Sequence, residues 1–218
     1  MTTKRVFFAF DAHAPWKKQE PKGRLIRHSD RHVTVAFLGN IDYEALEPLL
    51  AEIPIPDMRI GPIGIIDYPL FLPNSDHPHV FAAHVDWLTP GIDEYRNRLT
   101  GWLIEHGYAI AHADTPWLPH TTYCRKPFDS EEWQKQFAPM PLYSTALHLY
   151  ESLPQLCYEP IWSHHFLPPI SKERIIGETE AMLNAHVKAA EAFDPKMQIA
   201  GQPYLEDGLW VKDVQSSN

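Results

Sequence analysis

The sequence predicts an α+β fold, in which strands and helices do not alternate as they do around a parallel sheet. Three observations predict it. The chain shows apolar runs of strand length and runs with a helical pattern. Their order is one strand, followed by two copies of roughly β-α-β-β-α. The 21 prolines divide the chain into many short elements, because proline ends helices and fixes turns. A chain of 218 residues without a solenoid repeat suits one ordinary domain or two small lobes.

The elements of the first half follow from apolar runs and the breakers between them. They are a buried strand at 5–10, an irregular segment at 11–30, a strand at 31–38 closed by Gly39-Asn40, and a short helix at 42–52. Residues 58–66 are β-like, but Pro62 restricts them to an edge or bulged strand, since proline cannot donate a ladder hydrogen bond. A Pro- and Asn-rich loop is expected at 67–78.

The second half continues with strands at 79–86, 117–125, 142–151 and about 156–166, and with helices at about 91–106 and 130–137. Asp129 precedes the second helix, and Glu132 is placed to complete a capping box. From residue 171 the composition changes. The Ala- and Glu-rich stretch 172–193 contains no proline and predicts one long helix, which should pack on the body through an apolar stripe. The rest is expected to be an irregular tail with a loose end. The chain therefore divides into residues 1–170 and a C-terminal extension at 171–218.

Composition and charge narrow the class of protein. A hydrophobic content of 44% is that of a globular protein. The net charge of −9 should repel long nucleic acid, including a DNA duplex, but allows a nucleotide or a nucleic-acid end. Cys124 and Cys157 form neither a disulfide framework nor a zinc-ligand spacing, and no apolar run suits a signal peptide or membrane span. We expect a cytoplasmic protein that needs no membrane; the oligomeric state stays open.

One basic stretch stands out in this acidic chain. Between Lys17 and Arg31 there are six basic residues against only Glu20 and Asp30. Such a stretch is either a solvated loop or an edge that faces an anion. The sequence alone favours neither reading.

Two His-x-Thr triplets carry the residues best suited to chemistry. Side chains alternate along a strand, so His32 shares a face with Thr34, and His120 shares a face with Thr122. Two such strands side by side would flank a phosphate, with the imidazoles within about 8 Å of each other. One imidazole would take a proton from the nucleophile and the other would give one to the leaving oxygen, while the hydroxyls bind the non-bridging oxygens. The alternative is a pair of purely structural strand histidines.

At these residues the sequence resembles the two-histidine phosphoesterase superfamily, the group that includes the bacterial 2′-5′ RNA ligase-like cyclic phosphodiesterases. HVTVAFLG (32–39) is similar to its first signature, His-x-Thr-x-x-Phe-Leu-Gly, and WLPHTTYCR (117–125) to its second, aromatic-x-Pro-His-x-Thr-x-x-Arg. The spacing of 88 residues between the histidines, the later LHLYESL (147–153) and the opening RVFFAF (5–10) are also similar. The resemblance covers about residues 4–167.

The resemblance implies two pseudo-symmetric lobes of antiparallel sheet and helices around a central cleft. It implies opening of a 2′,3′-cyclic phosphate, or hydrolysis or reversible joining of a 2′-5′ linkage, on a nucleotide or RNA end, with no cofactor and no metal. By similarity, His32 gives the proton to the leaving oxygen, His120 activates water, and Thr34 and Thr122 hold the phosphate. The chain departs from the family in the short segment before the first motif and in the extension at 171–218.

Other functions and residues remain open at this point. The fold could serve a non-RNA cyclic phosphate, such as a cyclic ADP-ribose phosphate, or a module that binds nucleotides without turnover. A third reading is a metal site built from histidines, for which the candidates are His77, His79 and His84.

Strand alternation predicts that Cys124 faces the site, where it would fill space. It predicts that Arg125 faces away from the site, unless a β-bulge in the strand turns its side chain toward the site. The remaining candidates are Trp117 and Tyr150 for base stacking, and His112 and Asp114 for support of the second motif.

Overall fold

A nine-stranded antiparallel sheet forms the body of the protein in the computed structural model, which describes residues 2–215. Its strands lie in the order β7 (Met140–Tyr143), β4 (Ile63–Leu72), β5 (Val80–Trp87), β6 (His120–Arg125), β3 (His32–Asp42), β1 (Thr3–Asp11), β8 (Ala146–Leu153) and β9 (Cys157–His165). The short β2 (Arg24–Leu25) pairs with β6. The two strands that carry the His-x-Thr triplets, β3 and β6, are therefore neighbours at the centre, with three further strands on the far side of each.

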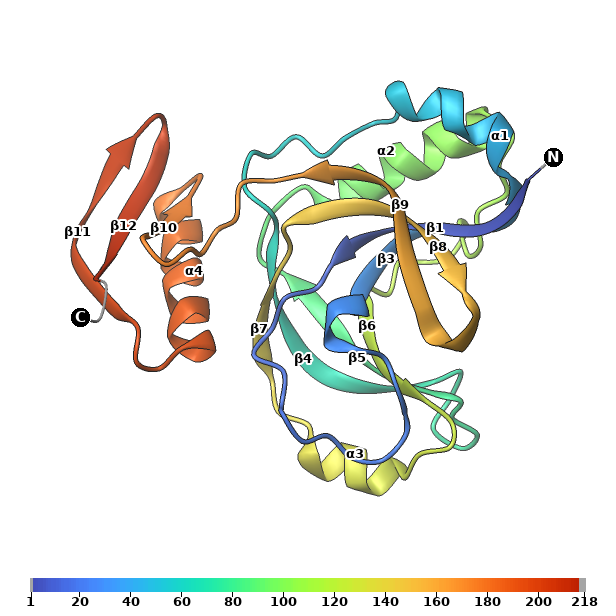
Figure 1. Cartoon of the computed structure of the whole chain (residues 1–218), viewed down its shortest axis with the longest axis horizontal. Helices are drawn as coiled ribbons and strands as arrows, with labels where there is room; N and C mark the ends of the chain where they lie inside the picture. The colour runs from blue at the N-terminus through green and yellow to red at the C-terminus, as the bar shows by residue number, and fades with distance from the viewer. Residues whose placement is uncertain (1, 216–218) are drawn as a thin grey trace.

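Helices cover the two halves of this sheet separately (Figure 1). The helices α1 (Tyr43–Leu46) and α2 (Ile92–Glu105) pack on β1, β3 and β8, where Leu46 and Leu99 join Phe8 in one buried core. The helix α3 (Ser130–Gln136) packs on the other half, where Trp133 joins Phe81 in a second core. The predicted α+β class and the two-lobed sheet are confirmed.

The segment before the first motif holds little regular structure, as expected. Between β1 and β3 there is only β2 and a short 3-10 turn at His28–Asp30. Further 3-10 turns continue α1 at Glu47–Ala51 and join β8 to β9 at Pro154–Leu156. The predicted helices at 91–106 and 130–137 are also found, and the Asp129 side chain accepts hydrogen bonds from the backbone amides of Glu131 and Glu132.

Three predicted strand boundaries in the body are wrong. β3 runs past Gly39 to Asp42, because Gly39 takes a left-handed φ of 72° where the register with β1 shifts. β4 begins after Pro62 and continues to Leu72 through the predicted loop, as an interior strand bulged before Pro69. The predicted strand at 142–151 is split into β7 and β8 at Ser144-Thr145, where the chain crosses from one half of the sheet to the other.

The Asp11 carboxylate holds that crossing in place. It accepts hydrogen bonds from the backbone amides of Thr145 (2.7 Å) and Ala146 (2.9 Å) and from the Thr145 hydroxyl (2.6 Å). The Ser144 hydroxyl donates to the Asp11 carbonyl at 2.6 Å. These bonds satisfy the backbone groups that leave the strand ladder at this point.

The C-terminal extension differs from the prediction of one long helix and an irregular tail. It contains β10 (Arg174–Gly177), α4 (Glu180–Phe193), β11 (Gln198–Glu206) and β12 (Leu209–Gln215), and the three strands form a second sheet in the order β10-β12-β11. The helix starts late because Thr179 caps it, accepting a hydrogen bond from the amide of Met182. Gly177 turns the chain where a Cβ would lie 2.3 Å from the Leu183 amide nitrogen. The end of the expected loose tail, 216–218, lies outside the described residues.

The extension packs beside the sheet, as predicted, with α4 against β4 and β7 (Figure 1). The ring of Phe193 lies 5.2 Å from that of Tyr143 on β7. Among residues 2–215, no helix is long and apolar enough to cross a membrane.

Candidate active site

The central strands bring the two His-x-Thr triplets side by side. β3 and β6 are antiparallel and pair at Val33 and Thr121. This register sets His32 across from Thr122, and Thr34 across from His120. Val33 and Thr121 are fully buried, whereas the other four residues are partly exposed, as alternation requires. All four predicted site residues therefore belong to one face of the sheet, called the imidazole face below.

Both imidazoles are anchored in the same way. The Nδ1 atom of His32 lies 2.7 Å from the carbonyl oxygen of Asp30, and Nδ1 of His120 lies 2.8 Å from that of Leu118. A carbonyl can only accept, so each Nδ1 carries the proton and each Nε2 is the atom left to gain or lose one. In each triplet the partner is the carbonyl two residues before the histidine. The two halves of the sheet thus present equivalent proton-transfer groups on the imidazole face.

His32 lies among aromatic rings. Its ring centroid is 4.7 Å from Phe7, 4.8 Å from Tyr158 and 5.5 Å from Tyr150. Burial there lowers the pKa of His32 to about 4, against the raising effect of its hydrogen bond to Asp30. The charges of His120 and Arg125 lower it as well. His32 is therefore neutral in the ligand-free protein near pH 7.

His120 has a different neighbour, His84. Burial lowers the pKa of His120, its hydrogen bond to the Leu118 carbonyl opposes this, and the charge of His84 lowers it too. His84 lies directly across from His120 on β5. Its Nδ1 is 2.8 Å from a carboxylate oxygen of Asp67, and its ring stacks on Tyr68 at 4.5 Å. The sequence indicates His84 only as a candidate metal ligand. Its place beside His120 follows from the pairing of β5 with β6, for which the sequence holds no local signal.

A β-bulge decides which way the end of β6 points. The register with β5 shifts between Thr122 and Cys124, so the strict alternation assumed from the sequence fails. Cys124 is fully buried in the core, and the prediction that it faces the site is wrong. Burial raises the pKa of its thiol to about 12. Arg125 is exposed, and its charge reaches His32, which agrees with the bulge re-aiming it toward the imidazoles.

Comparison with solved structures identifies the fold that carries this arrangement. E. coli LigT complexed with 3′-AMP is 20% identical to this chain at a TM-score of 0.54, over 76% of this chain and 99% of LigT. TT0787 of Thermus thermophilus is 19% identical at a TM-score of 0.54, over 74% of this chain and 97% of that one. The chain has the fold of the two-histidine phosphoesterases. No family model and no curated protein matches the sequence.

Two cavities of about 530 Å³ each lie near the imidazoles, one lined by aromatic neighbours of His32 and the other by His120 itself. The first is lined in part by Tyr150 and Tyr158, the rings that enclose His32. The second is lined in part by His120 and Trp117. The two aromatic residues expected to stack on a base, Tyr150 and Trp117, therefore lie in different cavities, one beside each imidazole.

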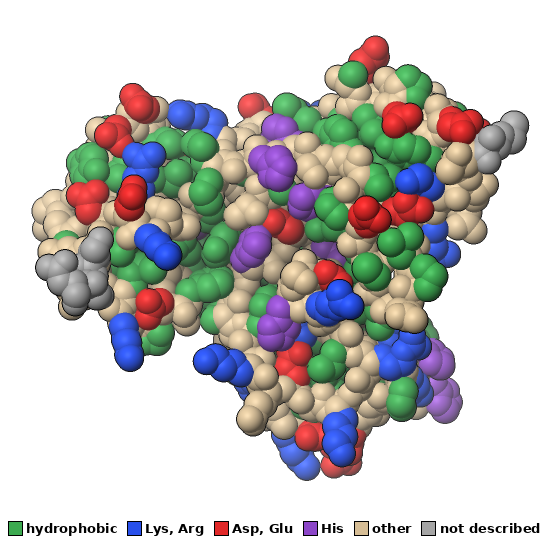
Figure 2. All heavy atoms as spheres, in the orientation of Figure 1, with side chains coloured by type: hydrophobic (Ala, Val, Ile, Leu, Met, Phe, Trp, Pro, Cys, Tyr) green, Lys and Arg blue, Asp and Glu red, His purple; other side chains and the backbone are tan. Residues whose placement is uncertain are grey.

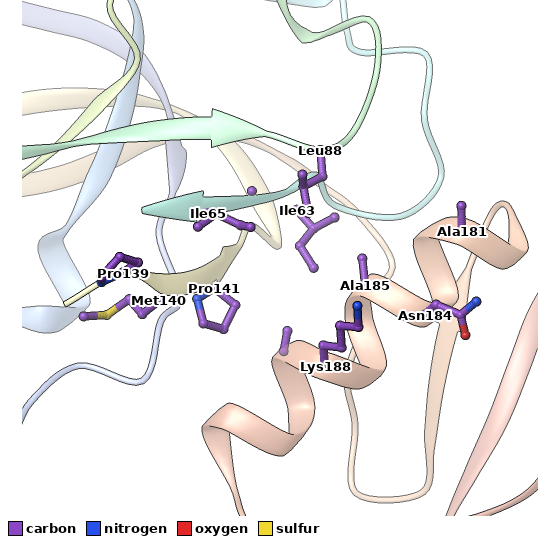
Figure 3. Close-up of a pocket in the computed structure, with 12 residues that line it drawn as sticks. Ile63, Ile65, Leu88, Pro139, Met140, Pro141, Ala181, Asn184, Ala185 and Lys188 are labelled. Carbon is purple, nitrogen blue, oxygen red and sulfur yellow. The ribbon is translucent and has the colours of Figure 1, made fainter. Parts of the chain in front are cut away.

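A third cavity, of about 420 Å³, lies at the seam between the sheet and the extension (Figure 3). Ala185 and Lys188 of α4 line one wall, and Ile63 and Ile65 of β4 line the other. Neither imidazole lines it. This apolar cavity is separate from the site.

The other histidines are spread along the molecule, and several gather along the middle of one face (Figure 2). Within residues 2–215, no three His, Cys, Asp or Glu side chains are placed to hold one metal ion. His77 and His79 are exposed in the loop before β5. His112 lines the cavity beside His120, and Asp114 is exposed in the adjoining turn.

Proposed function

We propose that the protein is a metal-independent phosphodiesterase that hydrolyses a 2′,3′-cyclic phosphate or a 2′-5′ phosphodiester of a nucleotide or RNA end, with reversible 2′-5′ joining when a 5′ hydroxyl takes the place of water in the attack on the cyclic phosphate. One observation carries the proposal: two imidazoles anchored alike through Nδ1, on adjacent strands, each with a threonine across from it. This set supplies an acid, a base and anion binders without a metal ion.

The proposed reaction proceeds by in-line attack on phosphorus. His120 Nε2 takes a proton from water as the water oxygen bonds to phosphorus. The bond from phosphorus to the ribose 3′ oxygen breaks, and His32 Nε2 gives a proton to that oxygen, which leaves a 2′-phosphate. Thr34 and Thr122 donate hydrogen bonds to the non-bridging oxygens, and Arg125 balances the charge that develops on them.

The low pKa of His32 has to be reconciled with its proposed role as the proton donor. With a pKa of about 4, His32 is a poor proton carrier in the free protein at neutral pH. A phosphodiester anion bound between the imidazoles favours their charged forms and raises the pKa of both. In the proposed mechanism, the substrate's own charge therefore prepares its proton donor.

The ligands bound by the structural neighbours support a nucleotide substrate. Solved structures of LigT contain 3′-AMP, and one contains phosphate, at TM-scores of 0.54 and 0.51 with this chain. The net charge of −9 argues against binding to a long DNA duplex. We further propose that residues 1–170 form the catalytic unit and 171–218 an accessory one, and that the protein works in the cytoplasm, where Cys124 and Cys157 stay as free thiols.

The test is turnover of a 2′,3′-cyclic nucleotide in excess EDTA. We expect His32→Ala and His120→Ala each to lower the rate on the order of 10²-fold or more, and the double variant to be little worse, because the two imidazoles act as one unit. His77→Ala, which replaces an exposed loop histidine, serves as the matched control and should keep the full rate.

Other outcomes point to the alternatives. Activity that is lost in EDTA and restored by Zn²⁺ or Mn²⁺ would support a metal enzyme. Binding of nucleotides without any turnover would support a binding module. Turnover of a cyclic phosphate on ADP-ribose, but of no cyclic nucleotide or 2′-5′ linkage, would move the substrate outside RNA.

A further inference from the structure

Arg96 is a buried cation without a counter-ion. It projects from α2, and only 8% of it is exposed. Within residues 2–215, no carboxylate lies at ion-pair distance from it, and its Nε has no hydrogen-bond partner. Its two hydrogen bonds are long, at 3.4 Å each, to the side-chain oxygen of Asn97 and the backbone carbonyl of His112. A buried unpaired charge is unfavourable, so its retention calls for an explanation.

Arg31 shows how the same fold treats a structural arginine. It is 1% exposed, and its Nη2 donates to both carboxylate oxygens of Glu20 at 2.6 and 2.7 Å. Its guanidinium lies 4.5 Å from the centroid of the Trp16 ring and 4.4 Å from that of Tyr123. Arg31 is thus neutralised and stacked on two sides. Its Nε and Nη1 have no hydrogen-bond partner, as is true of the Nε of Arg96, so the two arginines differ in the carboxylate. Arg96 differs from Arg31 in this respect: in the part of the chain that the structure describes, no carboxylate pairs with Arg96 as Glu20 pairs with Arg31.

The cavity that Arg96 lines belongs to the candidate active site. The same cavity of about 530 Å³ is lined by Thr34 and His120, which lie across from each other on β3 and β6 and flank the proposed phosphate position. Trp117 forms part of its wall, with its indole N–H donating to the Thr34 carbonyl at 3.1 Å and its ring centroid 6.0 Å from the Arg96 guanidinium. Apolar side chains such as Phe37 also line it. The cavity thus offers a nucleoside-sized space between His120 and the guanidinium of Arg96, which has no counter-ion.

We propose that this cavity binds a substrate that carries a second phosphate: the nucleoside lies against Trp117, and its 5′-phosphate pairs with Arg96. The proposal rests on the proposed function for the position of the first phosphate. A planar guanidinium matches the oxygens of a phosphate, and the missing counter-ion is then supplied by the substrate. The preferred substrate is accordingly a nucleotide with phosphates on both sides of the ribose, not a nucleoside cyclic phosphate with a free 5′ hydroxyl.

The test compares the binding of 3′-AMP and adenosine 3′,5′-bisphosphate by calorimetry, which requires no turnover. We expect the bisphosphate to bind wild-type protein about tenfold more tightly or better, the gain typical of a charge-assisted hydrogen bond. Arg96→Met should remove that preference. Arg98→Met on the same helix, at an exposed position, should keep it. Equal affinities in wild type, or a preference that survives in Arg96→Met, would overturn the proposal.

Thermal unfolding without ligand separates this binding role from a structural one. If the role of Arg96 is to bind an anion, Arg96→Met removes a buried charge that has no counter-ion in the ligand-free protein. The melting temperature should then stay equal or rise. A large fall would show that Arg96 also stabilises the fold, and Arg96→Lys is then the deciding variant. Its preference for the bisphosphate should fall partway, and an unchanged preference would overturn the proposal. If the bisphosphate preference holds while no cyclic phosphodiester turns over, the proposed function fails and the anion subsite stands.

Discussion

The protonation of His32 gives the sharpest test of the site's electrostatics. Burial lowers the pKa of His32 from 6.5 to about 4, and the charges of His120 and Arg125 act in the same direction. The displacement of about 2.5 pH units is large enough to measure in the free protein by NMR titration of the imidazole protons. A wild-type His32 that titrates near 6.5 would refute the burial argument.

Replacing one of the surrounding rings tests the cause. Tyr158 contacts the His32 ring edge-on at 4.8 Å and is one of three aromatic neighbours. Tyr158→Ala lets water reach one side of the ring, so we expect it to raise the pKa of His32 by about one unit, roughly a third of the displacement. Tyr68→Ala, which removes the ring stacked on His84, is the control and should leave the titration of His32 unchanged. An unchanged pKa in Tyr158→Ala would mean that aromatic burial does not set it.

Three further outcomes are expected. The free energy of unfolding should fall as pH drops from 6.5 toward 4, because burial lowers the pKa of both His186 and His32 to about 4. Urea unfolding of His186→Leu should show a loss about 3 kcal/mol smaller than that of the wild type, and an equal loss in the two proteins would contradict this. Arg125→Met should lower kcat/KM and raise the pKa of His32, and an unchanged titration would place Arg125 away from the site. Thr34→Val and Thr122→Val should each lower kcat roughly tenfold without shifting its pH dependence, whereas a shifted profile would implicate proton transfer.

Strand alternation predicted the candidate site because the relevant segments are regular. His32 and Thr34 lie in a strand whose intervening residue Val33 is buried, and the same holds around Thr121 in β6. In a regular strand, side chains alternate between the two faces of the sheet, so the face of each side chain follows from its position in the strand, independently of the rest of the fold. What alternation could not supply is the pairing of the strands, because Val33 and Thr121 are 88 positions apart. The resemblance to the family supplied that step.

The prediction failed where local backbone geometry breaks the period. One bulge in β6 moves Cys124 into the core, and a bulge before Pro69 lets β4 continue as an interior strand. In the extension, Asp207-Gly208 is a strong hairpin signal, with both residues at positive φ, where the prediction is an irregular tail. That signal was present in the sequence, whereas the bulges were not readable from it.

Arg96 and His84 were beyond sequence reasoning for a different reason. The amphipathic pattern of α2 does not distinguish a buried arginine with a partner from one without, since the partner would come from elsewhere in the chain. His84 gains its significance only from His120 across the sheet and from Asp67 on the next strand. Features that depend on several distant segments at once have no local signature.

The two halves of the sheet are nearly symmetric but have unequal surroundings, and this difference bears on how two identical groups can serve as acid and base. Each half contributes a central strand, a histidine anchored through Nδ1 and a threonine, so the groups are chemically identical. Their environments differ: aromatic rings enclose His32, whereas His120 faces His84 with its carboxylate partner. Unequal environments push the pKa values of identical groups apart. In the free protein the larger lowering falls on His32, the proposed proton donor, so the charge of the bound phosphodiester has to raise its pKa before it can donate. Since a single residue pair joins β3 to β6, the relative placement of the halves also sets the gap that the phosphate must bridge.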